Sequence, residues 1–203
     1  VNMTVDSNRF INLRKEPSEK YIAYCGTASN NKDGVDELIK SFAIVHKVHP
    51  EVKLYIIGKT PDPKDVSGNL KLIETLGLKD SIVFTGIVSA ADMPQILKNA
   101  TILALDRPDS LQAQCGFPTK LGEYLLTENP VVVTKVGDIP LFLKDGETAI
   151  FAEERNQEDF SSKLIWALEH PVESAKIGKA GAQVAMREFN YLNETKKIIK
   201  AIR

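Results

Sequence analysis

The chain has 203 residues, of which 26 are basic and 27 acidic, and this formal net charge of −1 gives no long-range attraction for nucleic acid. The apolar runs IVFTGIV and PVVVT are far shorter than the ~20 residues of a transmembrane helix, and the N-terminus has no basic-then-apolar signal pattern, so we expect a cytoplasmic protein. The two cysteines, Cys25 and Cys115, are too few for a disulfide framework and are expected to be free.

The first residues, VNMTVDSNRFINLRKEPSE, are polar and lack an alternating pattern, so residues 1–19 are interpreted as a linker that enters a domain spanning residues 20–203. From there on, short apolar runs rich in β-branched residues alternate with stretches of helical spacing. Gly, Pro, Asp or Asn bounds each run, which is typical of strands buried on both faces of a parallel sheet. The predicted strands are 21–25, 52–58, 81–86, 101–105, 130–134 and 148–152.

Between the first two strands, apolar residues at helical spacing predict a helix that covers the sheet. Its stripe consists of Val35, Leu38, Ile39, Phe42 and Val45. Further helices are predicted at about 69–77, 90–99, 119–128, 137–143, 157–169, 173–188 and 191–202. Repeated alternation of strand and helix implies right-handed crossovers, and therefore a single doubly wound, Rossmann-like α/β domain with about six mainly parallel strands and helices on both faces.

Ligands bind such sheets outside the carboxyl ends of the strands, and the turn after the first strand has the features of an anion site. In CGTASNNKDG, Gly26 and a small polar loop follow the strand, and Lys32 stands just before the next helix. Backbone amides in such a loop favour an anion, and the lysine adds a positive charge. A plain glycine turn with a solvated lysine is the alternative interpretation. Neither the GxGxxG fingerprint nor a Walker loop is present in the sequence.

A second anion site is predicted in the run GFPTKLGEYL. Pro118 is typical of the first turn of a helix, which would leave the amides of Thr119, Lys120 and Leu121 free at the positive helix end. Glu123 lies four residues after Thr119 and therefore on the same helix face. Its carboxylate could accept hydrogen bonds from ribose hydroxyls while the helix start holds a diphosphate. The alternative is an ordinary surface glutamate paired with Lys120.

The run GFPTKLGEYLLTENPVVVTKVGDIPLFLKDGETAIFA resembles the C-terminal domain of the family 4 (group 1) glycosyltransferases, which are retaining enzymes of GT-B fold with nucleotide-sugar donors. CGTASNNKDGVDELIKSFAIV is similar to the family's glycine loop with a lysine six residues on, and LKDSIVFTGIVSAADMPQIL also resembles the family. The leader VNMTVDSNRF resembles its interdomain linker. The resemblance implies that the chain is the donor-binding half of an enzyme whose N-terminal acceptor domain is missing.

By this resemblance, Lys32 contacts the donor diphosphate, the start of the helix at Thr119 holds it from the other side, and Glu123 holds the ribose. Backbone groups of Ile87 and Val88 would contact the base. The implied donor-binding residues are Gly26, Thr27, Lys32, Gly86, Ile87, Val88, Phe117, Pro118, Thr119, Lys120, Leu121 and Glu123.

The chain departs from the family pattern at two positions. Thr27 stands where many members have an arginine directly after the loop glycine, and Cys115 stands where the first glutamate of the paired-glutamate motif is expected. The first change removes a positive charge beside the leaving group, and the second removes a carboxylate near the sugar. Arg107, at the end of the TILAL strand, is a candidate replacement for the missing charge, so Lys32 and Arg107 are the predicted catalytic residues.

The expected activity is glycosyl transfer from a UDP-, GDP- or ADP-sugar, with no cofactor and no metal site. Lys32, Arg107 and Lys120 would neutralise the departing diphosphate with the helix start. The sequence has no Asp-x-Asp motif, and PDPKD is interpreted as a loop. A sugar-nucleotide epimerase, which would need a pair of carboxylates, and a non-catalytic nucleotide-binding module remain as alternatives.

The chain alone is expected to bind a nucleoside diphosphate without transferring sugar, because half of the catalytic cleft would be absent. The final helix carries an apolar stripe of Leu192, Ile198, Ile199 and Ile202. We expect this stripe to contact the missing N-terminal domain in the parent enzyme, or a second copy of the chain in a homodimer.

Overall fold

The computed structural model describes residues 3–16, 19–60 and 62–202. Within them the strands form one six-stranded sheet in the order β3-β2-β1-β4-β5-β6, and every neighbouring pair is parallel. The strands are β1 (Tyr21–Cys25), β2 (Lys53–Ile57), β3 (Ile82–Gly86), β4 (Ile102–Leu105), β5 (Val131–Thr134) and β6 (Ile150–Ala152). The predicted strands and the doubly wound α/β fold are confirmed. The strand order reverses between β1 and β4, so a crevice at their carboxyl ends is expected.

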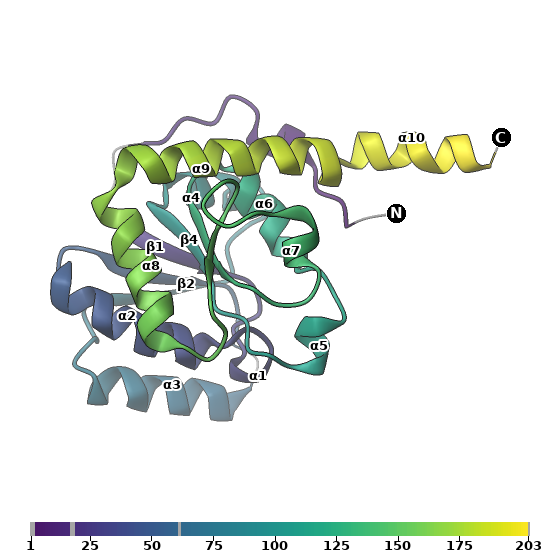
Figure 1. The fold of residues 1–203 in the computed structure, drawn as a ribbon. Helices are drawn as coiled ribbons and strands as arrows, with labels where there is room; N and C mark the ends of the chain where they lie inside the picture. The colour runs from purple at the N-terminus through teal and green to yellow at the C-terminus, as the bar shows by residue number, and fades with distance from the viewer. Residues whose placement is uncertain (1–2, 17–18, 61, 203) are drawn as a thin grey trace.

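Helices connect the strands and cover both faces of the sheet (Figure 1). They are α1 (Asn30–Asp33), α2 (Val35–Val48), α3 (Pro63–Thr75), α4 (Met93–Asn99), α5 (Leu111–Gln114), α6 (Thr119–Leu126), α7 (Ile139–Phe142), α8 (Gln157–Glu169), α9 (Pro171–Val184) and α10 (Tyr191–Ala201), with a 3-10 turn η1 (Ser7–Phe10) and a π turn η2 (Ala185–Phe189). Helices α2, α3 and α8 lie on one face, and α4, α6 and α9 lie on the other.

The core forms between these helices and the strands. Every residue of the stripe predicted for α2 is fully buried, and all residues of β1, β4, β5 and β6 are buried. Burial of one large aliphatic or aromatic side chain contributes about 1.5–3 kcal/mol to folding, so this sheet provides a rigid base for the loops at its edge.

The segments that form α1, α3 and α5 differ from the sequence prediction. The PDPKD segment is not simply a loop, because Asp62 caps α3 by accepting a hydrogen bond from the Lys64 amide at 2.8 Å and Pro63 is the first helical residue. Lys32 lies inside α1 rather than in a loop before the next helix. Helix α5 was not predicted, and the Ser110 hydroxyl caps it.

The N-terminal segment packs beside the start of α10. The Val5 amide donates to the Phe189 carbonyl at 2.8 Å, and the Asn190 side chain donates to the Ser7 hydroxyl at 2.9 Å. From this junction α10 extends away from the body of the domain (Figure 1). Its apolar stripe is partly exposed, as the sequence suggested: Leu192 48%, Ile198 43%, Ile199 42% and Ile202 78%. Contact of the stripe with another domain or a second copy stays a prediction.

Candidate functional site

The turns at the carboxyl ends of the strands and the start of α6 surround a cleft of about 500 Å³. We call this space the anion cleft, and its lining comes from the N-terminal segment, the β1–α1 turn and α6. The lining residues are Thr4, Val5, Asp6, Arg9, Cys25, Gly26, Thr27, Lys32, Thr119, Lys120 and Glu123. Six of the predicted donor-binding residues therefore meet in this cleft, although 91 positions separate Lys32 from Glu123 in the sequence (123 − 32).

The β1–α1 turn depends on glycine. Gly26 has φ +145°, and a Cβ there would lie 2.3 Å from the Lys120 ammonium nitrogen. The turn after β2 packs against it, since a Cβ on Gly58 would lie 2.1 Å from the Gly26 carbonyl oxygen. A larger residue at Gly58 would therefore push the two turns apart, and one at Gly26 would displace the Lys120 ammonium group.

Helix α1 presents Lys32 at the rim of the anion cleft. The Ser29 hydroxyl caps the helix by accepting the Lys32 amide at 3.4 Å, and Gly34 ends it in the left-handed conformation with φ +62°. The Lys32 side chain is exposed, so its ammonium group can reach an anion in the cleft.

Lys120 is ion-paired under the cleft. Its ammonium group donates to Asp33 Oδ2 at 2.6 Å and to the Tyr24 hydroxyl at 2.9 Å. Burial lowers the pKa of Lys120, and the negative charge of Asp33 opposes that shift. The side chain joins α6 to α1 in this structure, and its charge lies beside Gly26 rather than free in the cleft.

Arg107 lies behind the anion cleft and is only 4% exposed. Its guanidinium group donates to the Gly116 carbonyl at 3.1 Å and to the Gln112 carbonyl at 3.5 Å, which holds the segment before α6. Burial lowers the pKa of Arg107, while the charge of Asp33 raises it. Asp33 thus forms an ion pair with Lys120, and its charge also acts on the buried Arg107.

The start of α6 differs in detail from the prediction. Pro118 lies one residue before the helix, at its N-cap, with ψ 116°. The Leu121 amide donates to the Pro118 carbonyl at 3.0 Å, so it is already engaged, and the Leu121 side chain is buried in the core. Phe117 packs in an aromatic cluster with Phe142 and Phe189, at centroid distances of 5.4 and 4.7 Å.

Glu123 forms an ion pair that the sequence did not indicate. Its carboxylate accepts a hydrogen bond from Arg9, which also donates to the Ala90 carbonyl at 2.8 Å. Arg9 thereby bridges α6 and the loop after β3. The alternative pairing of Glu123 with Lys120 is wrong, because the Lys120 ammonium group contacts Asp33. The only sequence signal for Arg9 was its place in the leader VNMTVDSNRF, which resembles the family's interdomain linker.

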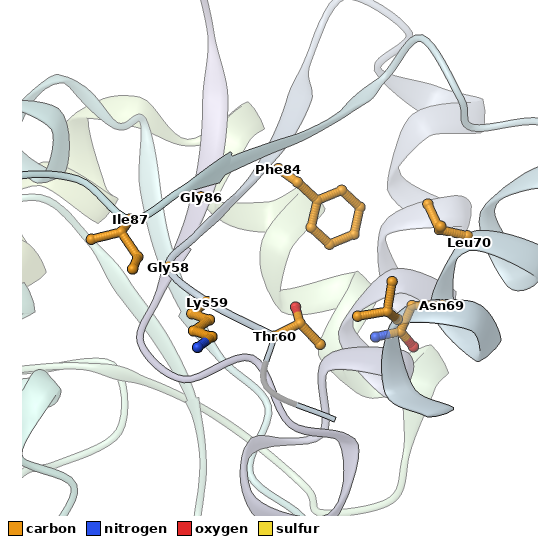
Figure 2. Close-up of a pocket in the computed structure, with 9 residues that line it drawn as sticks. Gly58, Lys59, Thr60, Asn69, Leu70, Phe84, Gly86 and Ile87 are labelled. Atoms are coloured by element: carbon orange, nitrogen blue, oxygen red, sulfur yellow. The ribbon is translucent and has the colours of Figure 1, made fainter. Parts of the chain in front are cut away.

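A second cavity, of about 380 Å³, opens beside the turns after β2 and β3, and we call it the apolar pocket (Figure 2). Figure 2 shows Phe84 and Ile87 from the β3 side and Asn69 and Leu70 from α3 around the same space. The full lining is Gly58, Lys59, Thr60, Val66, Asn69, Leu70, Phe84, Gly86 and Ile87. The predicted residues Gly86 and Ile87 lie here rather than in the anion cleft, while Val88 is half-buried against the core.

In the part of the chain that the structure describes, no three His, Cys, Asp or Glu side chains gather in an arrangement that could hold a metal ion. The same residues include no helix with the length and apolar character needed to span a bilayer. Both cysteines are free thiols, and Cys115 is exposed close to the start of α6.

The family model of the group 1 glycosyl transferases matches residues 19–170. The chain belongs to this family. Among curated relatives, this group 1 glycosyl transferase chain is 25% identical over 188 residues to mannosylfructose-phosphate synthase of Agrobacterium fabrum, covering 90% of the chain and 40% of that protein. It is 24% identical over 176 residues to D-inositol 3-phosphate glycosyltransferase of Segniliparus rotundus, covering 86% of the chain and 38% of that protein. The chain therefore spans about two fifths of the length of these relatives.

Comparison with solved structures identifies the fold of this group 1 chain. HepE of Anabaena in complex with UDP and glucose superposes with a TM-score of 0.83 at 18% identity, over 98% of this chain and 55% of that one. The C-terminal domain of the group 1 protein LpcC of Francisella tularensis superposes with a TM-score of 0.77 at 19% identity, over 92% of this chain and 99% of that domain. The chain has the fold of the C-terminal half of a GT-B glycosyltransferase.

Proposed function

We propose that this chain is the donor-binding domain of a retaining glycosyltransferase that moves a sugar from a nucleotide-diphosphate sugar to an acceptor without a metal ion. The observation that carries the proposal is the anion cleft, in which Lys32, the start of α6 and Glu123 meet beside the ion pair of Lys120 and Asp33. Family membership supports the reaction class. The complexes of HepE with UDP and with UDP-glucose support a nucleotide sugar as donor.

The diphosphate of the donor would lie between Lys32 and the first amides of α6, those of Thr119 and Lys120. Lys120, paired with Asp33, and the buried Arg107 lie behind this position, and their positive charges would add to the attraction for a diphosphate. As the bond between the sugar C1 and the diphosphate breaks, the electron pair leaves with the phosphate oxygen. Fixed amides and nearby cations stabilise that developing charge. In this arrangement Lys32 touches the leaving group, whereas Arg107 acts from behind by holding the Gly116 segment.

The ribose would bind at Glu123. A carboxylate accepts several hydrogen bonds, and Arg9 contacts one of the two oxygens, Oε1. The other oxygen can accept from a ribose hydroxyl while the pair with Arg9 holds the carboxylate in place. Arg9 then orients Glu123 and does not block it.

The base would enter the apolar pocket against the backbone of Ile87. The pocket has an apolar wall from Phe84, Leu70 and Ile87 and polar groups from Lys59 and Thr60, which suits a flat heteroaromatic ring with polar edges. Its volume of about 380 Å³ exceeds the need of a single base, so UDP, GDP and ADP all have to be tested.

The acceptor would be bound by the N-terminal half of the full enzyme. We propose that residues 1–19 act as the interdomain linker, that residues 20–203 form the donor domain, and that the stripe of α10 contacts the other half. Free thiols suit a reducing compartment, so the site of action would be the cytoplasm. The chain on its own would bind the donor and transfer no sugar, because reacting atoms meet only when both halves close.

Calorimetric titration of residues 1–203 with UDP, GDP and ADP tests the donor site. We expect one of them to bind measurably more tightly than its nucleoside. The full-length parent incubated with that labelled nucleotide sugar should yield a new glycoside. An epimerised donor would instead support an epimerase, and binding without turnover would support a non-catalytic module.

A further inference from the structure

Helix α1 has only four residues and therefore little stability of its own, yet it carries Lys32. Helix α3 holds its first residue in place. The Asn30 amide donates to Asp65 Oδ2 at 3.1 Å, and the side chains of Asn30 and Asn69 exchange two hydrogen bonds, at 3.0 and 3.1 Å. Three contacts from one residue thus tie α1 to a helix 30 positions further along the chain (63 − 33).

Helix α3 is itself attached by few apolar contacts. Asn69 and Ile73 are its buried residues, and Asn69 is only 1% exposed. Before Ile73, the apolar residues Val66 and Leu70 are 39% and 54% exposed, because they line the apolar pocket instead of the core. The buried residue of α3 before Ile73 is therefore Asn69, and both hydrogen-bonding groups of its side-chain amide face Asn30.

The two glycine turns reinforce this arrangement. The Ala28 amide donates to the Lys59 carbonyl at 2.9 Å, so the segment before α1 is bonded to the segment before α3. Asn69 then stands at the boundary between the two sites, since its side chain both lines the apolar pocket and holds the helix of Lys32.

We propose that Asn69 is a positioning residue that couples the two halves of the donor site. This inference rests on the proposed function. Through Asn30 it fixes α1 so that Lys32 faces the diphosphate. Occupation of the apolar pocket by the base stabilises the wall that Asn69 belongs to, so base and diphosphate bind cooperatively. Asn69 makes no contact with the diphosphate itself.

The test compares binding of inorganic pyrophosphate, uridine and UDP to the chain and to Asn69→Ala. Loss of two neutral hydrogen bonds predicts pyrophosphate affinity at least about fivefold lower in Asn69→Ala. Leu70→Ala is the matched control, because it removes a pocket contact on the same helix without touching α1. Leu70→Ala should lower the affinity for uridine and leave the affinity for pyrophosphate within about twofold of that of the unchanged chain.

Two further variants separate positioning from a loss of folding. Asn30→Ala removes the other side of the same amide pair at a half-buried residue, and should reproduce the pyrophosphate defect. Asn69→Ala combined with Lys32→Ala should bind pyrophosphate no worse than Lys32→Ala alone, since a displaced lysine and an absent one are equivalent. A purely structural role for Asn69 would lower the affinity for all ligands alike and would add to the effect of Lys32→Ala.

The outcomes are distinct. If the unchanged chain binds neither UDP nor pyrophosphate, the donor site is refuted and the coupling with it. If it binds UDP while Asn69→Ala and Asn30→Ala bind pyrophosphate with unchanged affinity, the coupling alone is refuted and the donor site stands.

Discussion

Replacement of Glu123 by alanine should weaken nucleoside diphosphate binding with little effect on folding. The side chain is 26% exposed and its partner Arg9 is 33% exposed, so their ion pair contributes only roughly 0.2–1 kcal/mol to stability. For a domain of this size that corresponds to a decrease in Tm of at most about 4 °C. A hydrogen bond from a ribose hydroxyl to a carboxylate is worth about 1.5–3 kcal/mol, so we expect affinity to fall about 10- to 150-fold.

Calorimetry with two ligands isolates the ribose contribution. The unchanged chain should bind the 2′,3′-dideoxy form of the preferred nucleoside diphosphate as weakly as Glu123→Ala binds the normal ligand. Glu123→Ala should not discriminate between the two ligands, because the group that reads the hydroxyls is gone. Arg9→Ala serves as control for the lost ion pair and should cost much less affinity than Glu123→Ala. Equal affinities of Glu123→Ala and the unchanged chain would refute the ribose role.

Lys32→Ala should reduce affinity for a nucleoside diphosphate much more than for its nucleoside, because the lysine lies at the anion cleft and not at the apolar pocket. Equal losses of affinity for both ligands in competition titrations would refute the phosphate role of Lys32. Burial, with the negative charges of Glu37 and Asp36, raises the pKa of Asp106 from 3.8 to about 7. Since the folded pKa lies above the unfolded one, this residue's contribution to stability is fully present below about pH 4 and is lost as the pH rises towards 7. Asp106→Asn should therefore be more stable than the unchanged chain by at least about 1 kcal/mol at pH 8 and should lose that advantage at pH 4, as measured by urea denaturation. A stability difference that does not depend on pH would contradict the raised pKa of Asp106.

The strands and the fold class could be predicted because each buried strand is a local apolar run with clear boundaries. The burial of the α2 stripe followed from spacing alone. The sequence analysis predicts a helix only from about residue 69 and interprets PDPKD as a loop, although Asp62 and Pro63 are a local capping signal for the start of α3. Helix α1 escaped prediction because its four residues are too few to show a helical period.

The contacts that organise the site could not be predicted, because they join distant residues. Arg9 and Glu123 are 114 positions apart, Asp33 and Lys120 are 87 apart, and Asn30 and Asn69 are 39 apart. The motifs identified which segments carry the chemistry, and folding determined which charges pair. Lys120 illustrates this difference, since its sequence position indicated a phosphate ligand and its ammonium group contacts a buried carboxylate.

The central claim is that a nucleoside diphosphate binds across the anion cleft and the apolar pocket. NMR amide shift mapping of residues 1–203 during titration with UDP, and with GDP and ADP if UDP fails, tests it most directly. We expect saturable shifts in the amides of Gly26, Thr119 and Lys120 at one site and of Ile87 at the other, and no comparable shifts along α8 or α10. Absence of saturable shifts with all three ligands, or shifts confined to surfaces away from both sites, would contradict the proposed donor site.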